Sequence, residues 1–221
     1  MKNLSFTQEY FLLAVNGKGE LPFLSSSEIA CCLVAGGIME LTRNGYVIQD
    51  ENKKLTLIKS WDNSLPYLTP IYNVIESFKE AKKVEAVVEP FALAVKDKQL
   101  KELVSTFRTS LIAEDCIIEE SEEGLLKDKT RYIPKPELVT QIIEKVRAEF
   151  LEEGSIAEDV LCLSVLLVQS NLIKNYFSKV EVMKMKERIK EVRNSDAYVS
   201  VKAIFDYMDA VAALIIIISA N

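Results

Sequence analysis

Lysine and arginine side chains carry the most recognisable binding chemistry in this sequence. Residues 174–193 contain seven lysine or arginine residues and only three glutamates. Such a cluster can attract phosphate groups or phospholipid headgroups, because both are anionic. The interpretation that we prefer is a solvated helix face, since charge runs usually serve solubility. In that case Met185, Ile189 and Val192 pack inward.

The residues needed for familiar catalytic chemistry are missing. The chain has no histidine, which excludes Ser-His and Cys-His nucleophiles and imidazole metal sites. Its four cysteines lie in apolar stretches without a CxxC pair, which predicts reduced, buried thiols (Cys31, Cys32, Cys116 and Cys162). The carboxylates form no recognisable catalytic pair, and Gly17-Lys18-Gly19 lacks the rest of a phosphate-binding loop. We therefore expect a non-enzymatic protein without a cofactor or metal.

Composition narrows the class of protein further. The chain has 221 residues, 49% of them apolar, and a net charge of −6. An acidic chain repels nucleic acid and anionic lipid on average, although a local basic patch can still bind them. The longest unbroken apolar run, residues 210–218, is far shorter than the roughly 20 residues of a bilayer span. Polar residues 2–9 also break any signal peptide. These features predict a cytoplasmic protein that is at most peripheral on a membrane.

Local signals in the first half predict the elements that would position these side chains. Ser5-Phe-Thr-Gln8 is a capping-box pattern for a helix that reaches about Val15. Residues 25–27 offer serine N-caps for a second helix that ends near Asn44, with Gly45 just beyond it. The spacing of apolar and polar residues then predicts strands at 46–48 and 55–58, an amphipathic helix at 68–83, a helix at 98–113, and strands at 116–118 and 130–133.

The second half reads as helical from Pro134 onward. Pro136 suits a helix first turn, and Gly154 is expected to end that helix. Ser155-Ile-Ala-Glu158 resembles another capping box, and it precedes residues 160–168, which are apolar nearly all round and so predict a buried helix. Further helices are expected at about 180–193 and 200–219. The predicted fold is mainly α: a single domain over 1–221 with a buried central helix, amphipathic helices around it, and two β-hairpins.

The order of these segments resembles the Golgi phosphoprotein 3 family. The similarity covers nearly the whole chain, through residues 4–15, 32–47, 107–118, 125–134, 155–176 and 211–220. It implies a scaffold whose known members bind phosphatidylinositol 4-phosphate on membranes. Richness in lysine, isoleucine and glutamate is typical of a bacterial member.

The resemblance also implies where a lipid headgroup would bind. Lipid-binding members use a tryptophan at the start of the second helix and three arginines. An ungapped placement puts Ser25 at the tryptophan and Val34, Lys101 and Val104 at the arginines. Lys101 retains charge but not the planar fork of arginine. Arg108 could replace an arginine in a different register. The candidate phosphate-binding residues are therefore Lys101 and Arg108, with weak or absent selectivity expected.

The family inserts the tip of its second hairpin into the bilayer. Here the tip offers Leu125 and Leu126, but four glutamates precede them and anionic headgroups would repel these. A solvated tip is the preferred interpretation. The expected partners are a phospholipid headgroup, a membrane surface or a protein.

One alternative is a winged-helix binder of nucleic acid, since a helix precedes a hairpin. That function requires a basic recognition helix. Residues 27–44 supply only Arg43 and are otherwise too apolar, so nucleic acid is disfavoured.

Overall fold

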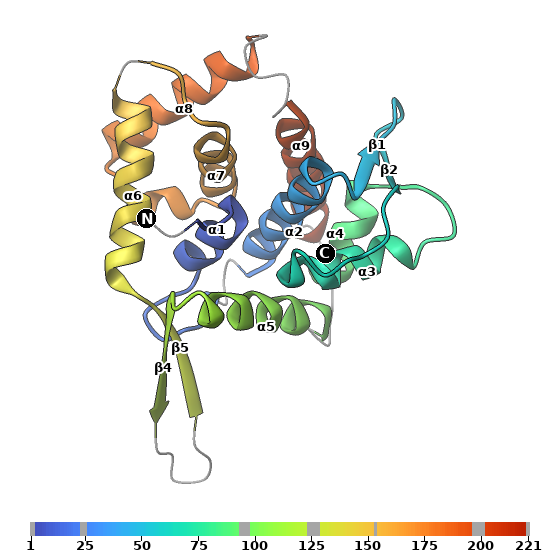
Figure 1. The fold of residues 1–221 in the computed structure, drawn as a ribbon. Coiled ribbons are helices and arrows are strands. Elements are labelled where there is room, and N and C mark those ends of the chain that lie inside the picture. The colour runs from blue at the N-terminus through green and yellow to red at the C-terminus, as the bar shows by residue number, and fades with distance from the viewer. Residues whose placement is uncertain are drawn as a thin grey trace.

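The computed structural model describes residues 3–22, 26–92, 98–122, 129–152, 154–195 and 202–219 (Figure 1). Most of these residues are helical. The helices are α1 (Phe6–Ala14), α2 (Ser26–Arg43), α3 (Thr69–Glu76), α4 (Val84–Ala92), α5 (Lys98–Ala113), α6 (Pro136–Leu151), α7 (Glu158–Gln169), α8 (Lys179–Arg193) and α9 (Lys202–Ser219). Short 3-10 turns are η2 (Pro66–Leu68) and η3 (Leu172–Asn175), and the strands are β1 (Val47–Gln49), β2 (Lys54–Leu57), β3 (Lys82–Lys83), β4 (Ile117–Glu122) and β5 (Lys129–Pro134).

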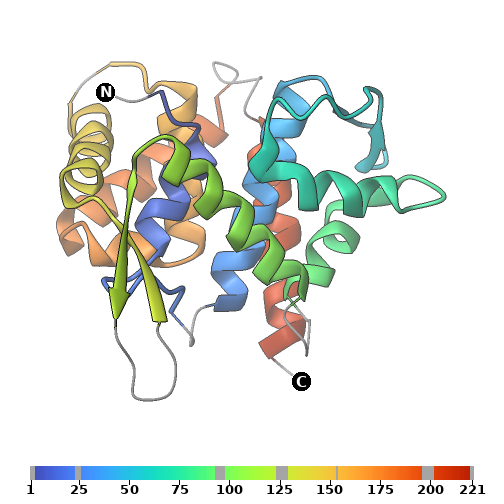
Figure 2. The same ribbon diagram turned by 60° about the horizontal axis from the view of Figure 1, so that its bottom comes forward.

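Three helices, α1, α2 and α7, share the centre of the molecule. Every residue of α1 is buried, as are residues 29–41 of α2 and 160–167 of α7. The other helices surround them, and α5 crosses one side of the group, where it packs against α1, α3, α4 and η2 (Figures 1 and 2). The predicted mainly-α class with a buried centre is confirmed.

Two adjacent glycines, Gly36 and Gly37, let α2 contact α1 and α7 on one face and α3 on another. A methyl group on Gly36 would lie 2.6 Å from Cγ2 of Thr7, in α1, and 2.9 Å from Leu166, in α7. A methyl group on Gly37 would lie 2.4 Å from Ile71, in α3. The small residues therefore allow neighbouring helices to approach α2 closely on two faces.

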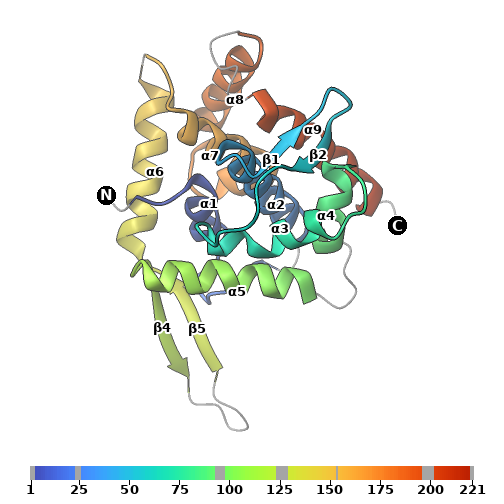
Figure 3. The same ribbon diagram turned by 45° about the vertical axis from the view of Figure 1, so that its right-hand side comes forward.

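The strands form two small antiparallel sheets. In the first sheet β1 pairs with β2, with Val47 opposite Leu57, and β2 pairs with β3. In the second, β4 and β5 form a hairpin that projects from one end of the molecule (Figures 1 and 3). Both predicted hairpins are confirmed, with strand ends shifted by a residue or more, but β3 was not predicted.

The predicted helix at 68–83 was correct in its first half and wrong in its second half. Helix α3 ends at Glu76, and the backbone of Lys82 pairs with Leu55 in the first sheet. The separate helix α4 follows at once. Pairing with a strand distant in the sequence overrides the local helical pattern here.

One of the two predicted capping boxes is confirmed. Ser5 forms the predicted capping box with Gln8, and Ser178 forms a further one with Glu181 that was not predicted. The predicted capping box at Ser155 was wrong, because α7 begins later with Ala157 as its N-cap. The backbone N–H of Ala157 instead donates to the carboxylate of Glu149, 2.6 Å away. A side chain from α6 thus replaces the local cap.

The predicted buried thiols are confirmed. All four cysteines are free and buried. Burial raises the pKa of Cys31 and of Cys162 to about 12, so neither is a reactive thiolate at neutral pH. Within the described ranges, no helix combines the length and the hydrophobicity that a bilayer crossing requires.

Candidate functional site

A polar cleft of about 780 Å³ lies between the start of α1, the end of α2, η2 and the second half of α5. Six serine or threonine hydroxyl groups line it, from Ser5, Ser64, Ser105, Thr106, Thr109 and Ser110. Neutral hydrogen-bonding groups of this kind can solvate a polar ligand but supply no net charge. Electrostatic character must therefore come from the few ionisable residues beside them.

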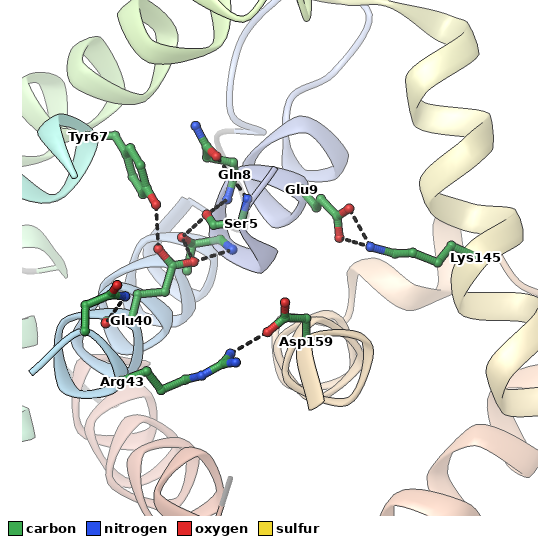
Figure 4. Close-up of polar contacts among 10 residues, drawn as sticks. Ser5, Gln8, Glu9, Glu40, Arg43, Tyr67, Lys145 and Asp159 are labelled. Carbon is green, nitrogen blue, oxygen red and sulfur yellow. Dashed lines mark hydrogen bonds and ion pairs between the residues drawn. The ribbon is translucent and has the colours of Figure 1, made fainter. Parts of the chain in front are cut away.

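The carboxylate of Glu40 lies against this cleft and is almost fully buried (Figure 4). It accepts hydrogen bonds from the backbone N–H of Thr7 at 3.0 Å, from the Thr7 hydroxyl at 2.5 Å and from the Tyr67 hydroxyl at 2.8 Å. Burial raises the pKa of Glu40, and these hydrogen bonds oppose the rise. Glu40 therefore joins α2 to the first turn of α1 and to η2.

The arginine side chain at the cleft, Arg43, already has a carboxylate partner within the protein. Arg43 forms an ion pair with Asp159, and its guanidinium lies 5.9 Å from the centre of the Phe6 ring. Among the described lining residues, Arg43 is the one lysine or arginine. Because its charge is matched by Asp159, the cleft is poorly suited to hold a phosphate group.

A second polar contact fixes α1 from its other side (Figure 4). Lys145 of α6 donates to both carboxylate oxygens of Glu9 at 2.5 Å. Burial raises the pKa of Glu9, and Lys145 opposes the rise. Together these contacts bind α1 to α2 and α6, so the polar residues around the cleft stabilise the packing of the helices.

Sequence reasoning missed the role of Glu40. The residue was read only as part of the ending of a helix. One signal was present: a glutamate inside the otherwise apolar run 29–41, which becomes the buried face of α2. A buried carboxylate requires hydrogen-bond donors, although its position in the sequence could not identify them.

The predicted phosphate-binding positions lie elsewhere in the molecule. Lys101 is exposed on α5, whereas Val104 is half-buried and packs against the core. Val34 is 0% exposed inside α2. Ser25 lies outside the described residues, as do Leu125 and Leu126 of the predicted hairpin tip.

Arg108 has local partners of its own. Its Nη2 donates to the carbonyl oxygen of Gly19 at 2.8 Å, and its guanidinium lies 4.9 Å from the centre of the Tyr132 ring. Burial lowers the pKa of Arg108. Gly19 has φ +74° and packs directly on the backbone of Tyr132. Arg108 thus joins the turn after α1 to β5, seven residues and about 10 Å of helix axis from Lys101.

The geometry of α2 also bears on the nucleic-acid alternative. This helix occupies the position of a recognition helix before a hairpin, but Ile29, Leu33 and Ile38 are 0% exposed. A helix packed in this way cannot enter a DNA groove.

The sequence model of the family described as Golgi phosphoprotein 3 (GPP34) matches residues 6–211 of the chain. The matched range begins in α1 and ends in α9. No curated protein sequence matches the chain.

Proposed function

Because the chain belongs to the Golgi phosphoprotein 3 family, we propose that it is a non-enzymatic, adaptor-type binding protein without selectivity for phosphatidylinositol 4-phosphate. It acts in the cytoplasm, where it docks peripherally on a membrane or on a protein partner. The family assignment supports the scaffold and the general class of function. The loss of headgroup selectivity rests on individual residues of this chain.

The burial of Val34 carries this proposal. From the family resemblance, we expect Val34 to occupy the position where the second helix of lipid-binding members has an arginine for phosphate. Its side chain has no exposed surface, so no headgroup reaches it. An arginine there would have to bury its charge among apolar neighbours, at a high free-energy cost.

The two corresponding positions on α5 support the same conclusion. Val104 offers no charge, and its half-buried side chain packs on the core. Lys101 provides a positive charge on an exposed surface, but an ammonium group cannot make the bidentate contact of a guanidinium. Arg108 does not restore the missing contact, because its guanidinium already binds Gly19 and stacks on Tyr132.

Chemistry at the polar cleft supports a binding function over catalysis. The described residues include no cluster of three or more histidine, cysteine, aspartate or glutamate side chains able to hold a metal ion. Glu40, the buried acid there, is held by Thr7 and Tyr67, and Arg43 is held by Asp159. These groups serve the fold, so we assign the chain no reaction.

Vesicle co-sedimentation tests this proposal. The chain is mixed with phosphatidylcholine vesicles, alone or containing phosphatidylserine or phosphatidylinositol 4-phosphate at equal surface charge. We expect equal binding to both anionic preparations, and no change for Lys101→Gln. Binding at least tenfold stronger to phosphatidylinositol 4-phosphate, and lost in Lys101→Gln, would refute the proposed loss of selectivity. Negligible binding to all vesicles would show that the chain does not dock on membranes, and binding to a protein partner would remain as its proposed function.

A further inference from the structure

Helix α8 lies on the outside of the molecule, at the end opposite the β4–β5 hairpin (Figures 1 and 3). One face of the helix packs inward through Val182, Met185 and Val192, all buried. This burial confirms the predicted inward packing of Met185 and Val192, and Ile189, which is partly buried, packs against the core as predicted. The opposite face is open to solvent, and its composition determines what it can bind.

The two arginines of α8 have structural partners. Arg188 donates to the carbonyl oxygens of Glu149 at 2.7 Å and of Glu152 at 2.5 Å, and also to that of Gly154. It therefore satisfies acceptors at the end of α6. Arg193 forms an ion pair with Asp209 of α9. Neither arginine is available for a ligand without loss of these contacts.

The lysines of α8, unlike its arginines, have no side-chain ion pair or hydrogen bond that holds them to the rest of the described structure. All four are exposed and have no ion pair with any described residue: Lys179, Lys184, Lys186 and Lys190. Lys186 and Lys190 lie at the edge of this face, where they line a cavity with Phe205 and Asp209 of α9. Glu187 and Glu191 share the open face, so the four lysines outnumber its carboxylates by two. The open face is therefore a local positive surface on an acidic chain.

Two large apolar side chains protrude among these lysines. Val180 is 63% exposed and Met183 is 62% exposed. They are three residues apart on one helix, so they are neighbours on its surface. Each would gain free energy on leaving water. Lys184 is the i+4 neighbour of Val180, and Glu187 is the i+4 neighbour of Met183. An exposed apolar pair with lysines beside it is typical of a helix that lies on a membrane interface, where lysine stems extend around the apolar contact.

We propose that the open face of α8 docks on an anionic lipid bilayer, with Val180 and Met183 entering the interface and the four lysines contacting headgroups. This inference rests on the proposed peripheral membrane function and names the surface that performs it. A bilayer is favoured over an acidic protein because this face is the convex outside of a single helix. A flat surface can contact such a face along its length, whereas a protein partner would need a matching groove.

Charge at the opposite end of the molecule agrees with this orientation. The hairpin segment 117–134 contains five carboxylates and three bases, and Glu119 and Glu120 are exposed. With α8 on an anionic surface, the hairpin points away from it, which avoids repulsion of these carboxylates. Docking through α8 and insertion of the hairpin tip are therefore mutually exclusive orientations.

Binding to phosphatidylserine vesicles tests the role of α8. The variant Lys184→Gln/Lys190→Gln removes two charges from the open face. Its matched control is Lys18→Gln/Lys98→Gln, which removes two exposed charges elsewhere. Each lysine near an anionic surface contributes about fivefold to binding, so the α8 variant should bind more than about tenfold more weakly. The control should bind within about twofold of the wild type, and Met183→Ser should weaken binding without changing its salt dependence.

The outcomes separate this inference from the function on which it rests. If the wild type binds phosphatidylserine vesicles and the α8 variant binds equally well, the inference is wrong and the membrane function stands. If the wild type binds no vesicle, the membrane function fails and this inference with it. Retention on immobilised polyglutamate without vesicle binding, lost in the α8 variant, would overturn the bilayer in favour of an acidic protein partner. Circular dichroism of each variant establishes that it is folded.

Discussion

The ion pair between Glu9 and Lys145 offers a sharp test of how the central helix α1 is held. Glu9 is 3% exposed, and both of its carboxylate oxygens lie 2.5 Å from Nζ of Lys145. Lys145→Met keeps most of the aliphatic stem but removes the charge. The remaining carboxylate would then be buried without a counter-ion.

The expected loss is large because the remaining charge is buried. Removing one partner of a buried ion pair destabilises a protein by about 3–5 kcal/mol. Replacing both partners with apolar residues of similar volume is often neutral or stabilising. We therefore expect Lys145→Met to lose about 3–5 kcal/mol at pH 7, and Glu9→Leu/Lys145→Met to recover most of that loss. The control Lys135→Met breaks a pair with Asp115, which is 76% exposed, and should cost about 0–1 kcal/mol.

Urea unfolding followed by circular dichroism measures these differences at several pH values. Burial raises the pKa of Glu9 above its ordinary value of 4.5, so the folded state binds the proton more tightly than the unfolded state does. Stability from this group therefore falls as pH rises from about 4.5 through the folded pKa. Loss of Lys145 raises the pKa of Glu9 further, so the stability lost in Lys145→Met should increase with pH. The reasoning would be refuted if Lys145→Met lowered the free energy of unfolding by less than about 1 kcal/mol at pH 7. It would also be refuted if the double variant were no more stable than Lys145→Met.

Three further predictions concern α2 and its contacts. Burial raises the pKa of Glu40, so stability from this group falls as pH rises above about 4.5, and Glu40→Gln should flatten the pH dependence of the urea midpoint. Tyr67→Phe removes a hydrogen bond to this carboxylate and should cost about 1.5–3 kcal/mol at pH 7 in the same assay. Gly36→Ala should lower the free energy of unfolding by about 1–3 kcal/mol, because the added methyl group meets Thr7 and Leu166. This cost should exceed the gain from the better helix propensity of alanine. An unchanged melting temperature would contradict the close packing at Gly36.

Local patterns predicted the elements whose signals lie within a few residues. The Ser5 capping box, the helix at 98–113 and the buried run 160–168 all correspond to observed features, since capping and amphipathicity are local. The second half of the helix predicted at 68–83 was wrong, because strand β3 pairs there with Leu55, which is distant in the sequence. The cap at Ser155 failed because a side chain from α6 took its place.

The polar contacts around α1 could not be predicted in the same way. Lys145 and Glu9 are 136 residues apart, and Arg108 and Gly19 are 89 apart. No spacing rule links such residues before the fold is known. Sequence placement on the family identified Lys101 and Arg108 as candidate ligand-binding residues, but only the structure revealed that Arg108 has intramolecular partners.

Calorimetric titration with a water-soluble, short-chain phosphatidylinositol 4-phosphate tests the central claim most directly, because it measures headgroup recognition without a bilayer. We predict no saturable binding tighter than a Kd of about 1 mM, which corresponds to roughly 4 kcal/mol. Saturable one-to-one binding with a Kd near about 1 μM, or roughly 8 kcal/mol, would show that this scaffold still reads the headgroup. That result would contradict the account, and loss of the binding in Lys101→Gln would identify the residue responsible.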